Sequence, residues 1–318
     1  MSGAATALAT RAVALAPMDG VTDHVFRELM TSRARPGALT FAVSEFVRVT
    51  DRPASMTVIR RAYPELARGG TTRTGTPVLL QLLGGQAEPL AVTARAAIAA
   101  GAYGVDLNFG CPAKLVNRHD GGACLLKSPE RIEKIVARVR EAVPADRPVS
   151  AKIRLGWDCR TDVATIALAA ERGGASWLTV HGRTKAEMYG PPADWASIGA
   201  ARRALGITTI ANGDLNTTSA VELCREQSGC DAFMLGRGPM GRPSLLCGDH
   251  QRETELIADL LREYVERMTE AGYPEGLRVA RVKQWLSLGT KVNAEVRPLF
   301  ESVKRLTNVT DVAAALRN

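Results

Sequence analysis

The chain has 318 residues, of which 46% are hydrophobic and 23% are charged, and this length suits one large domain with a small one. It contains no run of about 18 apolar residues, so we expect no membrane-spanning helix. The formal net charge of +8 suits a polyanionic partner, although a basic solvated surface accounts for it equally well.

The six cysteines form no Cys-x-x-Cys pair, and no cluster of histidines accompanies them. We therefore expect neither a disulfide framework nor a zinc site, and we predict no metal. Buried thiols are typical of a reducing compartment, so a cytoplasmic location is the default expectation.

Short apolar, β-branched runs recur along the first three quarters of the chain, and loop and helix signals follow each one. The runs do not alternate with polar residues, as expected for strands that are buried on both faces. Their spacing of about 25 to 45 residues suits one strand and one helix per unit. The predicted strands span residues 13–16, 39–43, 78–82, 105–107, 149–153, 178–180, 208–211 and 232–235.

Eight such units predict an α/β fold, a (β/α)₈ TIM barrel that ends near residue 243. The alternative is a doubly wound sheet, but Ala16-Pro17-Met18-Asp19-Gly20 follows the first strand where that fold usually has a Gly-x-Gly-x-x-Gly fingerprint. Helix starts are predicted at Ser128-Pro129 and at Ser219, which has Glu222 three residues later.

After Pro243 the apolar residues repeat at helical spacing, which predicts helices near 256–268, 277–288 and 297–306. We therefore predict a catalytic barrel domain over 1–243 and a small all-helical domain over 244–318. Residues 276–318 carry 8 basic and 3 acidic side chains, a net charge of +5. A positive surface of this kind suits RNA phosphates, and a solvated helix face is the alternative.

Active sites of such barrels lie at the carboxyl ends of the strands. Asn212-Gly213-Asp214 and Gly236-Arg237 follow the last two predicted strands, where barrels usually bind a phosphate. Unhindered backbone N–H groups and one guanidinium favour a phosphate site over tight turns with a solvated arginine. Polar or reactive residues follow most of the other strands: Pro17-Met18, Ser44-Glu45, Gln81, Asn108 to Cys111, Lys152 and His181.

The residues at these strand ends favour a flavin. The amide of Gln81 suits the pyrimidine edge of the ring system, and Lys152 suits a negative charge near its N1 atom. His181 is either a hydrogen-bonded core imidazole or a ligand contact, and its place at a strand end favours the contact. Cys111 stands in a Gly-Cys-Pro turn at the predicted barrel mouth, and an ordinary thiol is protonated at neutral pH. An acid is therefore a better role for Cys111 than an acyl nucleophile.

Several segments in family order resemble the tRNA dihydrouridine synthases over nearly the whole chain. Asn108-Phe109-Gly110-Cys111-Pro112 is the most specific of them. The others are Leu15 to Asp23, Gly104 to Pro112, Lys152-Ile153-Arg154, His181-Gly182-Arg183-Thr184, Ala211 to Asp214, Gly236-Arg237-Gly238 and Val279 to Leu286. Within the family the chain looks most like the bacterial C-type enzymes, which act on uridine 16 of the D-loop.

The resemblance implies an NADPH-dependent FMN enzyme that reduces a uridine in tRNA, with Cys111 as the proton donor to carbon 5. It also implies a target base that leaves the RNA stack. No membrane contact and no obligate protein partner are expected, and the enzyme should be a monomer. The implied FMN contacts are Pro17, Met18, Gln81, Lys152, His181, Asn212, Gly213, Asp214, Gly236 and Arg237. The implied tRNA contacts are Arg48, Tyr189, Arg281, Lys283 and Arg305.

Two other functions compete with this interpretation. A barrel flavoenzyme acting on a free pyrimidine, such as a dihydroorotate or dihydropyrimidine dehydrogenase, would also use FMN and an acidic thiol. It would have no need of the basic helical tail. An RNA-binding protein without catalysis is the second alternative, and the polar residues at the strand ends argue against it.

Overall fold

The computed structural model describes residues 7–118, 120–190, 192–248 and 252–317, without the side chains of 115 and 118. Within this part of the chain, eight parallel strands close into a ring through the pairings of β1 with β9 and of β2 with β4. The strands are β1 (Val13–Leu15), β2 (Phe41–Val43), β4 (Val78–Leu83), β5 (Val105–Asn108), β6 (Val149–Arg154), β7 (Trp177–His181), β8 (Thr208–Asn212) and β9 (Ala232–Leu235).

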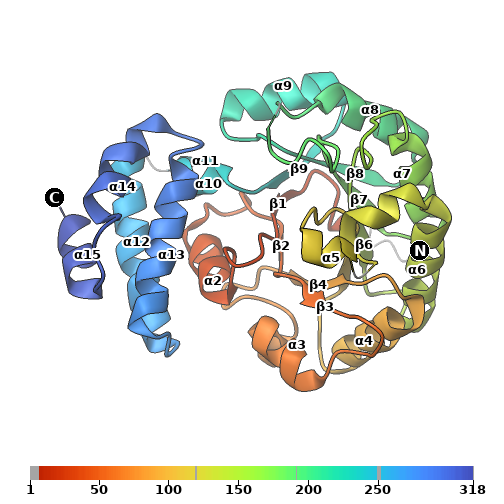
Figure 1. Cartoon of the computed structure of the whole chain (residues 1–318), viewed down its shortest axis with the longest axis horizontal. Helices are drawn as coiled ribbons and strands as arrows, with labels where there is room; N and C mark the ends of the chain where they lie inside the picture. The colour runs from red at the N-terminus through yellow and green to blue at the C-terminus, as the bar shows by residue number, and fades with distance from the viewer. Residues whose placement is uncertain (1–6, 119, 191, 249–251, 318) are drawn as a thin grey trace.

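The predicted barrel is therefore confirmed, and each predicted strand overlaps an observed one. Helices surround the ring of strands in Figure 1. One further strand, β3 (Val47–Arg48), extends the sheet beside β4. The helices around the barrel are α2 (His24–Arg33), α3 (Met56–Ala62), α4 (Ala87–Ala99), α6 (Pro129–Ala142), α7 (Val163–Arg172), α8 (Trp195–Ala204) and α9 (Thr218–Ser228), with 3₁₀ turns η1 (Pro64–Arg68) and η2 (Gly122–Lys127).

The local signals predicted the start of α6 correctly and misplaced the cap of α9. α6 begins at Pro129 as predicted, but the side chain of Ser128 makes no capping hydrogen bond. α9 is capped by Thr217, whose hydroxyl accepts a hydrogen bond from the backbone N–H of Ala220 at 3.0 Å. The predicted cap at Ser219 is wrong because Thr217 already has the extended backbone that a capping residue needs.

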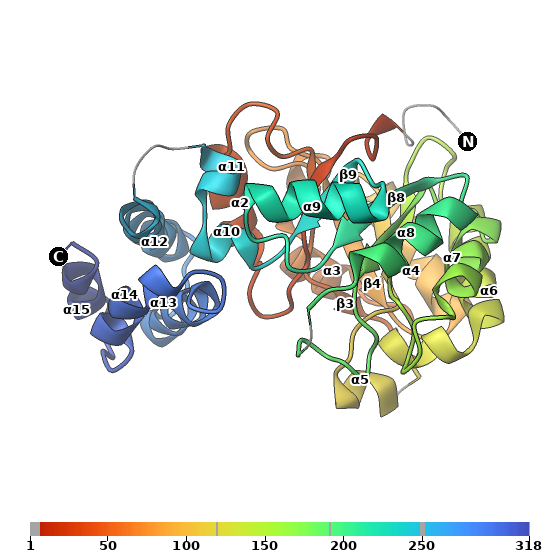
Figure 2. The same cartoon turned by 90° about the horizontal axis from the view of Figure 1, so that it is seen from above.

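Apolar side chains fill the barrel interior between its two ends. Phe41 and Trp177 are fully buried, with their ring centroids 5.4 Å apart, and they pack with Leu79, Ile210 and Met234. A second, larger cluster fills the space between strands and helices. Polar side chains are therefore concentrated toward the carboxyl ends of the strands, where α5 (Lys114–Arg118) projects from the barrel in Figure 2.

The remaining helices after residue 252 form a lobe beside the barrel, and α10 and α11 lie between this lobe and the barrel (Figure 1). Three of them match the predicted ones, while α15 was not predicted. No described helix is both long and apolar enough to cross a membrane. The predicted division at residue 243 falls between α10 and α11. The elements are α10 (Gly238–Gly241), α11 (Ser244–Cys247), α12 (Glu253–Glu270), α13 (Glu275–Gly289), η3 (Ala294–Val296), α14 (Arg297–Val303) and α15 (Val309–Ala315).

An aromatic cluster joins the helical lobe to α2 of the barrel. The rings of Phe26, Tyr264 and Trp285 contact one another, with the centroids of Phe26 and Trp285 4.9 Å apart. The Tyr264 hydroxyl donates to the carboxylate of Asp23 at 3.1 Å, and the indole N–H of Trp285 donates to the carbonyl of Met240 at 3.0 Å. Because these polar groups are buried and paired, the lobe has a defined position against the barrel.

Candidate active site

A buried polar network lies below the barrel mouth, on β4, β5 and β6. Gln81 is fully buried, and its amide N–H donates to Asp106 at 2.7 Å while its oxygen accepts from Asn108 at 2.8 Å. Ser150 donates to the other oxygen of Asp106 at 2.6 Å. Burial raises the pKa of Asp106 above its ordinary value. This network fixes the Gln81 amide and leaves one of its N–H hydrogens for a ligand.

Lys152, on β6, lies above this network and contacts β8. Its ammonium nitrogen is 3.0 Å from the side-chain oxygen of Asn212, whose amide nitrogen donates to the Met234 carbonyl at 2.8 Å. Burial and the nearby charge of Arg154 lower the pKa of Lys152 to about 7. An anion bound beside Lys152 would restore the charged form, because an opposite charge favours it.

His181 ends β7 and lies next to the turn after β8. Burial and the surrounding cations hold its pKa well below the ordinary value, so the imidazole is neutral. Its Nδ1 atom is buried and has no hydrogen-bond partner among the described residues. Buried polar atoms are nearly always paired in folded proteins, so this atom points to a ligand.

The turns after β8 and β9 form a cationic corner around one carboxylate. Asp214 forms an ion pair with Arg183 and lies 3.3 Å from Arg237, and it has a positive φ of 53°. Its carboxylate also accepts from the N–H of Ala193 at 2.9 Å. A non-glycine residue with positive φ stores backbone strain, which is common at functional sites.

The backbone of these turns is available to a ligand. The N–H groups of Gly213, Asp214, Gly236 and Arg237 donate to no other residue in the described part of the chain. A Cβ atom at Gly236 would already lie 3.6 Å from the sulfur of Met18, which is ordinary contact. Several N–H groups with cations nearby match what a phosphate needs.

Cys111 lies on the loop after β5 and is half-buried. Its N–H and that of Gly110 both donate to the side-chain oxygen of Asn108 at 3.0 Å, and its carbonyl accepts from Ala123 and Asn117. Burial and the charge of Asp19 raise the pKa of the thiol above its ordinary value of 9.0. The thiol is therefore protonated at neutral pH and suited to donate a proton.

Arg154 joins the thiol loop to the loop after β7, a role that the sequence did not suggest. Its guanidinium donates to the carbonyls of Gly110 at 2.8 Å, Thr184 at 3.1 Å and Met188 at 2.9 Å. It is 3% exposed. The signals in the sequence were a charged residue at the end of an apolar strand and its place in the segment Lys152-Ile153-Arg154, and neither indicated these contacts.

Tyr189 lies over the cationic corner and is 55% exposed. Its ring centroid is 5.2 Å from the guanidinium carbon of Arg154, 5.7 Å from that of Arg237 and 6.2 Å from the His181 ring. An exposed aromatic ring at this place offers a surface on which a base or ring system can stack.

The other residues predicted to bind tRNA are spread over three regions. Arg48, on β3, contributes its charge to the environment of Cys111. Arg281 is largely buried, and its Nε atom lies 3.5 Å from Asp23 at the junction of lobe and barrel. Lys283 is on the same helix, whereas Arg305 follows α14 and is exposed. The structure therefore groups Arg48 and Tyr189 with the predicted cofactor residues and places the rest on the lobe.

These observations define a class of protein: a parallel-barrel enzyme whose strand ends fit a phosphate-bearing anionic ring cofactor beside a protonated thiol. The chain also matches the family model described as dihydrouridine synthase over residues 14–316. It therefore belongs to the dihydrouridine synthase family, whose members are flavin-dependent oxidoreductases that modify uridine in tRNA.

Relatives with curated names are similar over almost their entire length. The tRNA-dihydrouridine(16) synthase of Salmonella typhimurium is 42% identical, covering 96% of this chain and 98% of its own. The enzyme of the same name from Escherichia coli K12 is also 42% identical, over 96% and 97%. That of Neisseria meningitidis is 40% identical, over 96% and 93%.

Solved structures with the same fold include two more distant proteins. A 2-naphthoyl-CoA reductase complex aligns with a TM-score of 0.53 at 12% identity, covering 84% of this chain and 51% of that one. Histamine dehydrogenase from Rhizobium sp. 4-9 aligns with a TM-score of 0.53 at 11% identity, covering 74% and 45%. This chain thus spans about half the length of either structure, and the likeness supports the barrel fold.

Proposed function

We propose that the protein reduces uridine 16 in the D-loop of tRNA, with FMN as its flavin and NADPH as its reductant. The names of the curated relatives support the choice of uridine. The observation that carries the proposal is the protonated thiol of Cys111 beside a cationic strand-end site. A hydrolase or a passive RNA-binding protein has no need of that pairing.

In the proposed site the phosphate of FMN would be held by the N–H groups of Gly213, Asp214, Gly236 and Arg237, with the guanidinium of Arg237. Pro17 and Met18 would line the edge of the ring system, and the sulfur of Met18 lies close to Gly236. Gln81, Lys152, His181 and Asn212, on β4, β6, β7 and β8, would contact the ring system.

The chemistry divides between cofactor and protein. Bound in its reduced form, the flavin is a hydride donor for carbon 6 of the uracil ring. Cys111 donates its proton to carbon 5, and the resulting thiolate takes a proton from solvent before the next cycle. Lys152, whose ammonium nitrogen lies 3.0 Å from the side-chain oxygen of Asn212, would stabilise negative charge on the reduced ring system. The uridine must leave the tRNA stack to reach the thiol.

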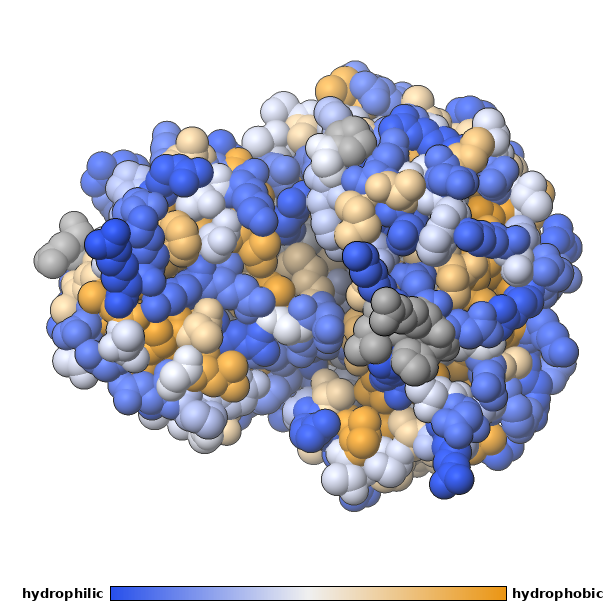
Figure 3. Space-filling view, viewed as in Figure 1, coloured by the Kyte–Doolittle hydropathy of each residue, from blue (hydrophilic) through white to orange (hydrophobic). Residues whose placement is uncertain are grey.

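Basic residues around the mouth and on the lobe would hold the RNA. Arg48 and Tyr189 would contact the flipped nucleotide, and Lys283 and Arg305 would contact the backbone. Figure 3 shows a furrow between the C-terminal helices and the barrel. We propose that the tRNA lies across this furrow and that a monomer without another protein performs the reaction.

The test is dihydrouridine formation by the purified full-length protein. Unmodified tRNA is incubated with NADPH and the flavin-loaded enzyme, and mass spectrometry of nuclease fragments locates the added two hydrogens. Reduction at position 16 supports the proposal, and reduction only at another uridine refutes the assigned position. Reduction of free uracil with none of tRNA would favour an enzyme of free pyrimidines.

A further inference from the structure

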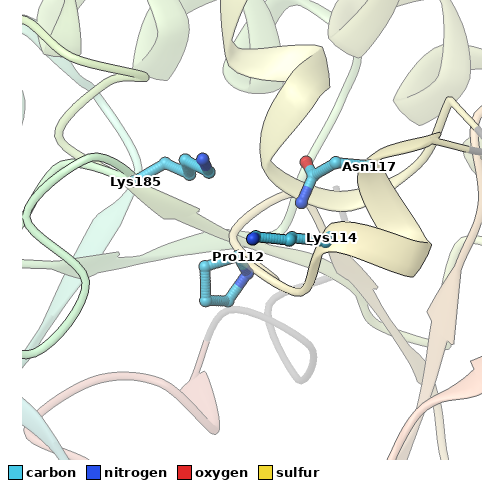
Figure 4. A pocket seen from close by; sticks show the side chains of 4 residues that line it. All are labelled: Pro112, Lys114, Asn117 and Lys185. Atoms are coloured by element: carbon cyan, nitrogen blue, oxygen red, sulfur yellow. The ribbon is translucent and has the colours of Figure 1, made fainter.

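A small cavity with two lysines opens directly beside the catalytic loop. Pro112, Lys114, Asn117 and Lys185 line it, and its volume is about 260 Å³. Pro112 is the next residue after Cys111, so the cavity and the thiol share one turn of chain. In Figure 4 the side chains of Lys114 and Lys185 converge on this opening from α5 and from the loop after β7. We call these four residues the lysine pocket.

The positive charge of the lysine pocket is not neutralised by the protein. Among the described residues, Lys114, Lys127 and Lys185 form no ion pair with a carboxylate. Glu187, the acidic residue closest in sequence to Lys185, is paired with Arg160 and accepts from the N–H of Thr184 at 2.8 Å. An anion from outside is therefore the natural counterion of the pocket.

Trp157 holds one of the lysines close to a second cation. The ammonium nitrogens of Lys127 and Lys185 lie 4.0 Å and 4.3 Å from the centroid of its ring. Two like charges separated by no more than about 8 Å repel each other, and a bound anion relieves that repulsion. The ring of Trp157 thus attracts two cations, of which Lys185 also lines the lysine pocket.

The floor of the pocket is fixed by the hydrogen bonds that position Cys111. The Asn117 amide nitrogen donates to the carbonyls of Cys111 at 3.2 Å and Ala113 at 2.8 Å. Its oxygen accepts from the N–H of Cys124 at 2.7 Å. An anion in the pocket therefore sits at a set position relative to the thiol.

We propose that the lysine pocket binds a phosphodiester of the RNA strand, next to the nucleotide whose base lies at Cys111. This inference rests on the proposed function, because it needs a flipped uridine at the thiol. The phosphates that flank such a nucleotide lie about one sugar away from the base, at the edge of the mouth. Lysine is a suitable phosphate ligand there. The contact would fix the position of the RNA strand so that carbon 5 of the uracil lies at the thiol.

The test compares tRNA binding by Lys114→Gln, Lys185→Gln and the double variant across salt concentrations. Lys134→Gln is the matched control, since Lys134 is an exposed lysine on the outer helix α6. Each lost phosphate contact should lower the slope of log affinity against log salt by roughly 0.7 to 0.9. We expect several-fold weaker binding for each single variant, a wild-type slope for Lys134→Gln, and recovery of the slope in Lys185→Arg.

Flavin reduction by NADPH without tRNA is measured on the same proteins. Unchanged reduction with a lower salt slope supports an RNA phosphate. A raised half-saturating NADPH concentration with unchanged tRNA affinity would assign the pocket to the nicotinamide nucleotide and overturn the inference. A salt slope equal to that of wild type in the double variant would also overturn it. If the variants lower the salt slope as expected but the wild type reduces no tRNA, the phosphate contact is supported while the proposed reaction is contradicted.

Discussion

The ammonium group of Lys152 is hydrogen-bonded to Asn212 at 3.0 Å, which joins β6 to β8 at the floor of the active site. The positive charge of nearby Arg154 lowers the pKa of Lys152, and the negative charge of nearby Asp106 raises it. Lys152 is thus held in a polar contact that does not require its positive charge. A pKa of about 7 means that a large share of the molecules carry a neutral amine at physiological pH.

The low pKa of Lys152 predicts a pH dependence of stability in the flavin-free protein. Between about pH 8 and pH 9 the side chain is largely neutral when folded and protonated when unfolded, since the ordinary pKa of lysine is 10.5. The unfolded state then binds more protons, so this residue makes stability rise with pH. We measure the free energy of unfolding in urea for the wild type and for Lys152→Met. The value for the wild type should rise with pH more steeply than that of the variant, by no more than about 1.4 kcal/mol per pH unit. An identical pH dependence in both proteins would contradict the assignment.

Cys111→Ala should keep its flavin and its reduction by NADPH, while reduction of tRNA slows by about 10²- to 10⁴-fold, the usual contribution of a general acid. Burial raises the pKa of the thiol above 9.0, so proton donation should persist through neutral pH and fail only in alkaline solution. Rapid mixing of pre-reduced enzyme with tRNA measures this step. An unchanged rate of tRNA reduction in the variant would show that the thiol is not the proton donor.

The ion pair of Arg27 and Glu65 should matter greatly for stability. Both side chains are fully buried, with hydrogen bonds of 2.8 Å and 2.9 Å between them. Glu65→Gln leaves a buried guanidinium uncompensated and should cost about 3 to 5 kcal/mol of unfolding free energy. Glu88→Gln, which breaks the exposed pair with Arg138, is the control and should leave the melting temperature nearly unchanged. Equal losses in the two variants would contradict this account.

The two basic residues of α13 should behave differently when neutralised. Lys283→Gln should weaken tRNA binding several-fold without changing thermal stability, because it makes no ion pair among the described residues. Arg281→Gln should also lower the melting temperature, since its guanidinium lies against Asp23 and donates to Gln284 at 3.0 Å. Binding isotherms and thermal unfolding on the same samples separate the two effects. A stable Arg281→Gln protein would contradict the structural role of that residue.

The barrel was predictable because each strand is an apolar run of a length that buried parallel strands share. The strand-end rule then located the mouth residues, since carboxyl ends of parallel strands meet at one rim. β3 was missed because two residues carry no periodicity, and α15 because it is seven residues long. Local turn signals identified the start of α6 correctly and misplaced the cap of α9 by two residues.

Side-chain pairings across strands were not predictable, because they depend on register. Asp106 faces Gln81 and Ser150 only because those residues are its partners in the neighbouring strands. The three carbonyls bound by Arg154 belong to residues that lie 30 to 44 positions away along the chain. The proposed contacts to FMN and tRNA stay predictions that the experiments above address.

The guanidinium of Arg154 connects the loop that carries Cys111, which we call the thiol loop, to the loop that carries Tyr189. It donates hydrogen bonds to carbonyls in both loops. Moving either loop would break the hydrogen bonds that it accepts from this buried cation, one for the thiol loop and two for the loop carrying Tyr189, which disfavours a moving flap here. The target ring must instead enter from the open side, along the furrow seen in Figure 3. Discrimination among pyrimidines would then come from the fixed distance between the thiol loop and the loop carrying Tyr189. The size of the substrate would matter more than closure of a loop over it.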